Sequence, residues 1–253
     1  MIKKKISKLS EKFPYLSYLF KFKFIHYLKI LISRRYRWIA NTYSRFGKNN
    51  RKNIFLGISR FLHINRPIEG YYFEFGCNEA NTIRIAYDSF KNLFKLTYVA
   101  FDSFEGLPEP DNNDKSEIFK KGNLSFSEKA FKKICLKHGI PDDKLIIFKG
   151  FYEKTLNLQT QKYLESKKAA VIYIDCDLYS STVTVLKFVK FFLQPGTIIV
   201  FDDWNCFIGD PLKGERRAFN EFCADNKSFI FEKFYQDMES CAFIFLGEKN
   251  SGY

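Results

Sequence analysis

Several common sequence patterns are missing from this chain of 253 residues. Its six cysteines form no Cys-x-x-Cys pair, so we expect reduced, mostly structural thiols in a cytosolic protein rather than a disulfide framework. The turn after the first predicted strand keeps only Gly76 of a Gly-x-Gly-x-x-Gly pattern, which argues against a dinucleotide fingerprint. Residues 103–137 contain no histidine.

Acidic residues are scarce at the N-terminal end. Residues 1–53 hold 15 of the 41 Lys and Arg but only Glu11 among the 28 acids, whereas the rest of the chain is close to neutral. The net charge of +13 therefore belongs to a basic, aromatic-rich helical arm, residues 1–53, followed by one domain, residues 54–253. Because the arm has no recognisable nucleic-acid motif, nucleic acid is not an expected partner.

A long uninterrupted apolar run is also absent from the arm. Lys21, Lys23 and Lys29 break its apolar stretch, which excludes a transmembrane helix and a signal peptide. Two interpretations stay open: a helix that packs on its own domain or on a second copy, or a helix on an anionic membrane surface. We expect a cytoplasmic protein, with the inner membrane as the surface in the second case.

Aspartates follow two apolar runs of strand length. Residues 171–174 lead into Asp175 and Asp177, and residues 198–201 lead into Asp202 and Asp203. Runs that are apolar on both faces are typical of covered parallel sheets. The acids would then lie at the edge where open α/β sheets bind ligands. Such a carboxylate cluster repels itself and favours a divalent cation.

The remaining pattern alternates strands with helices. Strands are predicted at 70–76, 96–102 and 144–150, helices at 53–64, 127–137, 180–193 and 213–225, and a terminal hairpin at 229–235 and 241–246. Five strand–helix alternations followed by a hairpin predict an α/β, doubly wound, mostly parallel sheet with one antiparallel strand.

Two further acids stand at predicted strand ends. Glu74 is either a ligand contact or a structural carboxylate that holds the following turn. Asp102 follows the second strand, where a carboxylate can accept both hydroxyls of a ribose. The loop that starts at Ser103 is long and rich in Pro and Asn, which is typical of a lid or a substrate wall.

Five motifs in order resemble the macrocin O-methyltransferase (TylF/MycF-type) family of S-adenosylmethionine-dependent sugar methyltransferases. They are Phe73–Gly76, Phe101–Pro108, Lys149–Phe151, Ile174–Thr182 and Val200–Trp204. The resemblance covers roughly residues 55–246 and does not include the arm.

The resemblance implies a Rossmann-like fold with S-adenosylmethionine across the first two strands. It implies that Glu74 and Gly76 border the methionine part, that Asp102 holds the ribose, and that Ser103 and Phe151 lie near the adenosine.

It also implies a magnesium site formed by Asp177, Asp202 and Asp203, with Asp175 supporting the site or contacting the cofactor. Mg²⁺ would chelate two sugar hydroxyls and lower the pKa of the one that attacks the methyl group. The implied acceptor is a sugar or another small polyol-like molecule of surface-polysaccharide or glycoconjugate synthesis, and the implied assembly is a homo-oligomer.

One family feature is missing. The family's proposed general base is a histidine in the loop after the second strand, and this loop has none. His138, Lys120 or Lys121, or a metal-bound hydroxide are the alternatives. Two other function classes stay open: a nucleotide-sugar glycosyltransferase that uses Asp175 and Asp177, and a non-catalytic interaction module that acts through the arm.

Overall fold

The computed structural model describes residues 33–65, 69–110, 114 and 119–249. The chain divides into two compact units between Asn50 and Arg51. The described part of the first unit contains α3 (Arg34–Trp38), a π-helix (Ile39–Tyr43) and the beginning of α4 (Ser44–Ile64). The expectations for residues 1–32 lie outside the described residues. No helix in the described ranges is long and apolar enough to cross a membrane.

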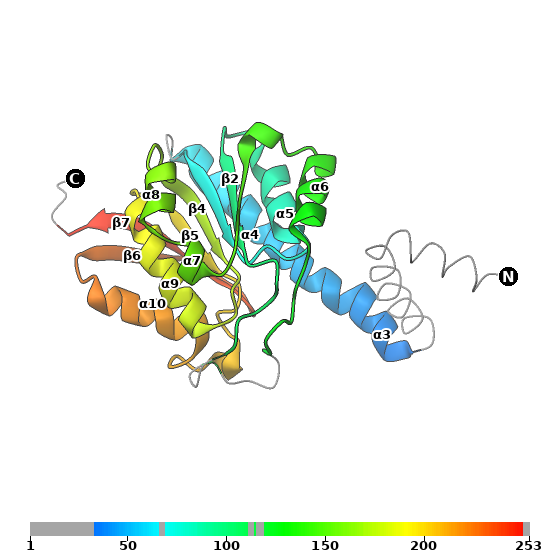
Figure 1. Cartoon of the computed structure of the whole chain (residues 1–253). Helices are drawn as coiled ribbons and strands as arrows, with labels where there is room; N and C mark the ends of the chain where they lie inside the picture. Colours follow the sequence, from blue (N-terminus) through cyan, green and yellow to red (C-terminus); the bar gives the residue numbers. More distant parts are fainter. Residues whose placement is uncertain (1–32, 66–68, 111–113, 115–118, 250–253) are drawn as a thin grey trace. The chain divides into compact units, whose positions relative to one another are not determined.

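The second unit is built on one seven-stranded sheet with the order β3-β2-β1-β4-β5-β7-β6 (Figure 1). The first five strands are parallel, and β7 runs antiparallel to both β5 and β6. The predicted mixed sheet with an edge hairpin is therefore confirmed. The strands are β1 (Tyr71–Phe75), β2 (Thr97–Asp102), β3 (Leu145–Lys149), β4 (Ala169–Ile174), β5 (Ile198–Phe201), β6 (Phe229–Gln236) and β7 (Cys241–Glu248).

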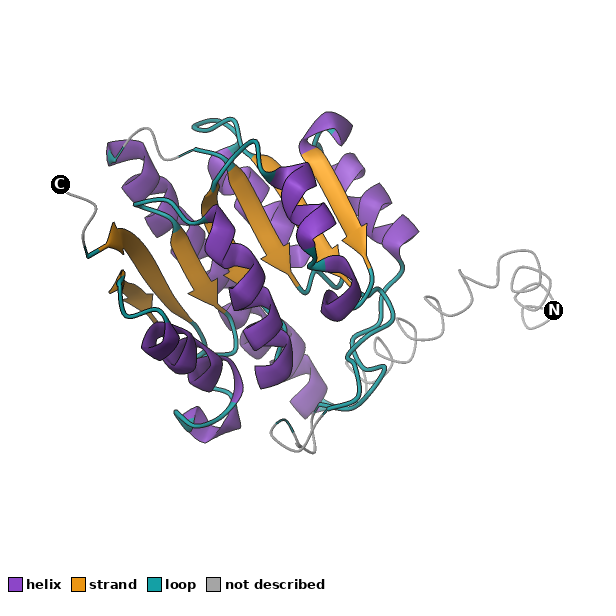
Figure 2. Cartoon of the chain, turned by 60° about the vertical axis from the view of Figure 1, so that its left-hand side comes forward, coloured by secondary structure: helices purple, strands orange, loops and turns teal. Residues whose placement is uncertain are grey.

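Helices cover both faces of this sheet (Figure 2). One apolar cluster joins the sheet to α4, α5 and α6, and the other joins it to α8, α9 and α10. The remaining bounds are α5 (Asn81–Phe90), α6 (Glu128–His138), α7 (Tyr152–Thr155), α8 (Leu158–Leu164), α9 (Tyr179–Val189) and α10 (Gly214–Asp225), with short 3-10 turns at Asp142–Lys144, Lys190–Phe192 and Phe207–Gly209.

Alternation along the strands explains why both faces are apolar. In β4 every residue is buried; Tyr173 packs in the first cluster, whereas Ile172 and Ile174 pack in the second. Successive side chains of a strand point to opposite faces, so a fully apolar strand needs a helical layer on each side. This is the environment that the sequence predicts for the central strands.

Strand register brings the ligand-binding residues to one level. Phe75 is opposite both Phe101 and Ile174, and Ile174 is opposite Phe201. The residue after each of these therefore emerges at the same sheet edge. Strand order reverses between β1 and β4, and a crevice at the carboxyl ends of strands on either side of such a reversal is the usual binding place in open α/β sheets.

Local signals explain several element boundaries. Ser127 caps α6 by accepting the N–H of Ala130, and Gly139 ends that helix in a left-handed conformation, as this pair of residue types predicts. α4 differs from the prediction because it begins at Ser44 and is continuous through residue 53, the predicted end of the arm.

Candidate active site

A cavity of about 300 Å³ opens at the carboxyl ends of β1, β2, β4 and β5. Eight of the ten site residues predicted from the sequence line it: Gly76, Asp102, Ser103, Phe151, Asp175, Asp177, Asp202 and Asp203. Residues from four strand ends and from the loop after β2 therefore share one cavity. Its volume is at the lower end of the range for small-molecule sites.

The turn after β1 depends on Gly76. Its φ is +83°, and a Cβ at this position would lie 1.8 Å from the main-chain oxygen of Asp175. The Gly76 N–H donates to the Phe101 carbonyl at 3.0 Å, and the Asp175 N–H donates to the Phe75 carbonyl at 2.9 Å. Only glycine permits this close approach of the β1 and β4 ends.

Asp102 ties two loops together at the rim of the cavity. Its Oδ2 accepts the N–H groups of Cys77 at 2.7 Å and Asn78 at 3.1 Å, and its Oδ1 accepts the Phe104 N–H at 2.6 Å. Hydrogen bonds from backbone amides to a carboxylate are among the stronger ones. The β1–α5 turn and the loop after β2 are thus held by one side chain.

The loop after β2 is ordered locally by Ser103. Its hydroxyl donates to the Gly106 carbonyl at 2.7 Å and accepts the Glu105 N–H at 3.0 Å. Gly106, Leu107 and Pro108 follow it along the cavity wall. The loop after β2 therefore forms part of the cavity wall, and its role toward a substrate stays a prediction.

A residue farther along the same loop was not identified from the sequence. Asp114 is fully buried and accepts the backbone N–H groups of Tyr179 at 2.5 Å and Ser180 at 3.1 Å. It therefore caps the N-terminus of α9, shortly after Asp177, and joins the loop to that helix. The only sequence signal is an acid in a long loop, which has no partner until the chain folds.

Five acidic side chains lie close together at this edge: Asp175, Asp177, Asp202, Asp203 and Glu215. The pKa values of Asp175 and Asp203 are well above the usual range, because burial penalises their charge and neighbouring carboxylates repel it. Burial, and secondarily the Asp175 charge, raises the pKa of Asp177 to about 7. This crowding favours bound protons or a bound cation.

Two oxygens of the cluster are buried without a hydrogen-bond partner: Asp203 Oδ2 and Glu215 Oε1. The other oxygen of each of these two carboxylates accepts a hydrogen bond. Asp203 Oδ1 accepts the Cys206 thiol at 3.2 Å, and Glu215 Oε2 accepts the Asp203 N–H at 3.0 Å. Buried unpartnered oxygens are costly, so a cation or a proton bound at this position would stabilise the cluster.

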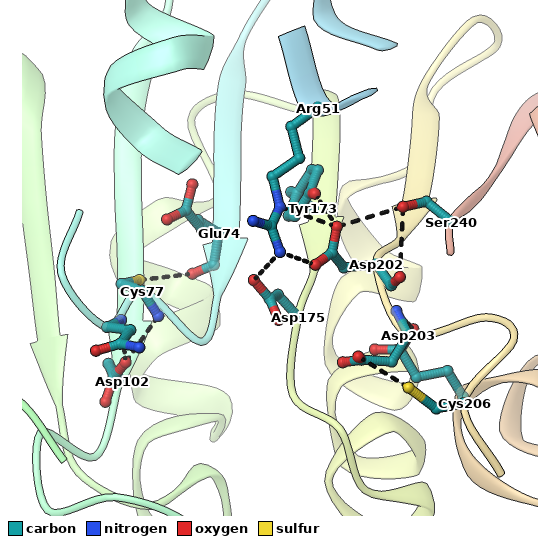
Figure 3. A network of polar contacts seen from close by, with 12 residues as sticks. Arg51, Glu74, Cys77, Asp102, Tyr173, Asp175, Asp202, Asp203, Cys206 and Ser240 are labelled. Carbon is teal, nitrogen blue, oxygen red and sulfur yellow. Dashed lines mark hydrogen bonds and ion pairs between the residues drawn. The ribbon is translucent and has the colours of Figure 1, made fainter. Parts of the chain in front are cut away.

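A single arginine from α4 enters the cluster. Arg51 donates through both Nε and Nη2 to the two carboxylate oxygens of Asp202, and its Nη2 lies 4.0 Å from an oxygen of Asp175 (Figure 3). The Tyr173 hydroxyl also donates to Asp202. Arg51 is one of the 15 basic residues of the arm, residues 1–53, and no local pattern links it to a partner that is 151 positions away.

Two predicted site residues do not line the cavity. Glu74 belongs to β1 rather than to the turn after it, so its side chain points to the helical layer and is fully buried beside the Tyr72 hydroxyl. His138 ends α6 and contacts Asp88 of α5 at 2.9 Å. Since α6 leads into the start of β3, its C-terminal end lies near the amino ends of the strands, whereas the cavity lies at their carboxyl ends.

Comparison with known proteins decides the family. The sequence model described as Macrocin-O-methyltransferase (TylF) matches residues 84–229, which is more than half of the chain. The chain belongs to this family. TylF-family proteins are S-adenosylmethionine-dependent O-methyltransferases, so this assignment replaces the glycosyltransferase and interaction-module alternatives. No curated protein matches the chain in sequence.

Solved structures show the same fold. The O-methyltransferase NovP has a TM-score of 0.63 and 18% identity over 77% of this chain and 78% of its own. The calicheamicin methyltransferase CalS11 has a TM-score of 0.64 and 16% identity over 87% of this chain and 89% of its own. An O-methyltransferase from Bacillus cereus in complex with SAH has a TM-score of 0.50 and 12% identity over 79% and 81%.

The methyl donor of this TylF-family member is S-adenosylmethionine. The cavity suits it, because Asp102 and the carboxylates that follow β4 and β5 line the cavity and acidic groups attract a positively charged sulfonium.

A divalent cation suits two of the three predicted ligands. Carboxylate oxygens are the ligands that Mg²⁺ prefers, Asp177 and Asp203 both line the cavity, and Asp203 Oδ2 has no partner. Asp202 differs because Arg51 engages both of its oxygens. Within the described ranges, accordingly, no three His, Cys, Asp or Glu side chains converge as a complete metal site.

Proposed function

We propose that this TylF-family enzyme moves a methyl group from S-adenosylmethionine to a hydroxyl of a sugar or another small polyol-like acceptor, with help from Mg²⁺. The observation that carries the proposal is the acidic wall, with an unpartnered Asp203 oxygen, in the same cavity as the Gly76 turn and Asp102. CalS11, which shares the fold with a TM-score of 0.56 in its apo form, is described as a TDP-rhamnose 3'-O-methyltransferase.

Four residues position the methyl donor in this proposal. Asp102 holds the ribose by accepting one hydroxyl on Oδ1, which among the described residues accepts only the Phe104 N–H, and Gly76 allows the turn to approach the methionine part. Ser103 and Phe151, which line the same cavity, border the adenosine. S-adenosylmethionine supplies an electrophilic methyl group on a sulfonium, so the protein mainly has to orient the acceptor and exclude water.

The cation would be held by Asp177 and Asp203, and by Asp202 once its carboxylate is free, with Asp175 supporting the cluster. Bound Mg²⁺ supplies a Lewis acid that lowers the pKa of a coordinated hydroxyl. The side chain proposed to accept the hydroxyl proton is Asp177, which lines the cavity and can hold the cation through one carboxylate oxygen and accept the proton on the other.

The predicted alternatives for the base are less well placed. The described residues that line the cavity include neither His138 nor any lysine. Lys121 is exposed and lies 3.6 Å from Glu109, and Lys120 is exposed as well.

The test is transfer of labelled methyl from S-adenosylmethionine to a panel of nucleotide sugars, with Mg²⁺ or with EDTA. We expect transfer with Mg²⁺ and a loss of at least about a hundredfold with EDTA or in Asp203→Asn, which is typical when a group that stabilises developing charge is removed. The exposed Asp143→Asn is the matched control. Equal transfer with EDTA would reject the metal, and failure of S-adenosylhomocysteine to bind would reject the cofactor site.

The same proposal places the enzyme in surface-polysaccharide or glycoconjugate synthesis, in the cytoplasm and at the inner membrane, as a homo-oligomer. The charge of residues 1–53, where Lys and Arg outnumber acids 15 to 1, supports the membrane contact alone, because each basic residue near an anionic surface contributes about 1 kcal/mol. Sedimentation with anionic vesicles but not with neutral vesicles is the expected result. Equal sedimentation with both would reject the electrostatic contact, and a monomeric mass in light scattering would reject the oligomer.

A further inference from the structure

Arg51 is the one cationic side chain among the described residues that line the cavity. It comes from α4, and Figure 3 shows it pointing toward Asp175, which follows β4, and Asp202, which follows β5. Its side chain is 30% exposed and that of Asp202 is 7% exposed, so the pair is largely withdrawn from water. Burial is the largest single effect and lowers the pKa of Arg51, but the charge and hydrogen bonds of Asp202, together with Tyr173 and Asp175, outweigh it and raise the pKa further above its usual value.

Arg51 engages both carboxylate oxygens of Asp202. Oδ2 accepts Arg51 Nη2. Oδ1 is within hydrogen-bond reach of three donors: Arg51 Nε at 3.2 Å, the Tyr173 hydroxyl, and the Ser240 hydroxyl at 3.3 Å. Since one carboxylate oxygen offers about two lone-pair sites, Oδ1 is fully used, and the guanidinium stands in front of Oδ2. Asp203, by contrast, keeps one oxygen unpartnered.

We propose that Arg51 is a tethered cation that competes with the divalent metal for Asp202, so that metal loading requires the guanidinium to leave. This inference rests on the proposed metal requirement and adds a residue that controls it. Arg51 neutralises the cluster in the metal-free enzyme. When the metal binds Asp177 and Asp203, the added positive charge repels Arg51 and releases Asp202 as the third ligand.

Competition of this kind sets the apparent metal affinity. The apparent dissociation constant equals the intrinsic one divided by the fraction of molecules in the competent state. If Arg51 holds Asp202 in more than about nine-tenths of the metal-free molecules, it weakens binding by about tenfold or more. A weak, displaceable site of this type would load only when the cation is abundant or when the acceptor brings additional ligands.

The experiment measures Mn²⁺ binding by electron paramagnetic resonance in the full chain at pH 8.5, without turnover. We expect Arg51→Gln to tighten Mn²⁺ binding at least tenfold. Lys52→Gln removes the same charge from the next, exposed position of α4 and should change affinity less than twofold. In an Asp202→Asn background the effect of Arg51→Gln should disappear, because the competition acts through that carboxylate.

Arg51→Lys keeps the charge but loses the bidentate contact with Asp202, so it should tighten Mn²⁺ binding by a smaller factor than Arg51→Gln. If Arg51→Gln does not fold, Arg51→Lys tests the competition in its place. Binding of S-adenosylhomocysteine by each variant confirms a folded cofactor site. Equal or weaker Mn²⁺ binding in both Arg51 variants, with the wild type binding measurably, would overturn the competition alone. Absence of Mn²⁺ binding in every variant, with S-adenosylhomocysteine still bound, would overturn both this inference and the proposed metal.

Discussion

Replacing Glu74 by glutamine should change how the stability of this enzyme depends on pH. Glu74 is fully buried in β1; its Oε2 accepts the Tyr72 hydroxyl, and its Oε1 has no partner. Burial raises the pKa of Glu74 from 4.5 to about 8, although the Tyr72 hydrogen bond and the charge of Arg51 act in the opposite direction. The native protein therefore holds a proton on Glu74 at neutral pH.

The direction in which stability changes with pH follows from proton linkage. Between pH 4.5 and 8 the native state binds this proton and the unfolded state does not, so stability falls as the pH rises. The stability that Glu74 gains by keeping its proton in the native state is fully present below pH 4.5 and is lost as the pH rises through the native-state pKa of about 8. At about 1.4 kcal/mol per pH unit, the wild type loses about 3 kcal/mol relative to Glu74→Gln between pH 5.5 and 7.5.

Urea unfolding of both proteins at pH 5.5, 6.5 and 7.5, followed through the buried Trp204, measures this difference. A glutamine oxygen can still accept the Tyr72 hydroxyl, so the variant should fold, and equal urea slopes would show that the unfolded states are comparable. The exposed Glu165→Gln should track the wild type. Parallel pH curves for Glu74→Gln and wild type would refute a protonated Glu74.

Two further substitutions test the turns around the cavity. Gly76→Ala should destabilise the fold by at least about 3 kcal/mol in the same urea titration, because its Cβ would lie 1.8 Å from the main-chain oxygen of Asp175. The control is Gly122→Ala: Gly122 also has a positive φ, but its Cβ would meet nothing within 4 Å, so the substitution should cost only about 1 kcal/mol. Equal costs would show that backbone conformation, not the close approach, requires glycine. Asp102→Asn places an amide NH₂ against at least one of three backbone N–H groups, so calorimetry should show S-adenosylmethionine binding weakened about tenfold, a loss of about 1.4 kcal/mol; unchanged affinity would contradict the role of Asp102.

Much of the site could be predicted because it depends on local rules. Apolar runs that end in Asp175 and Asp202 specify buried strands whose acids emerge at one edge, and parallel register brings those edges together. Glu74 and His138 were predicted as site residues, but neither lines the cavity. The alternation of side chains along β1 points Glu74 toward the helices that cover the sheet. α6 runs antiparallel to the strands, so His138 at its C-terminal end lies near the amino ends of the strands, opposite the cavity.

The mixed sheet, the alternation of strands and helices, the glycine turn and the aspartates at the strand ends could all be predicted, since each follows from the spacing of a few neighbouring residues. Which charges meet depends instead on how distant segments pack. Arg51 and Asp202 are 151 positions apart, and no periodicity links them. Their contact arises because α4 packs on the face of the sheet to which Tyr173 points, which brings a guanidinium to the ligand that the strand pattern assigns to a metal.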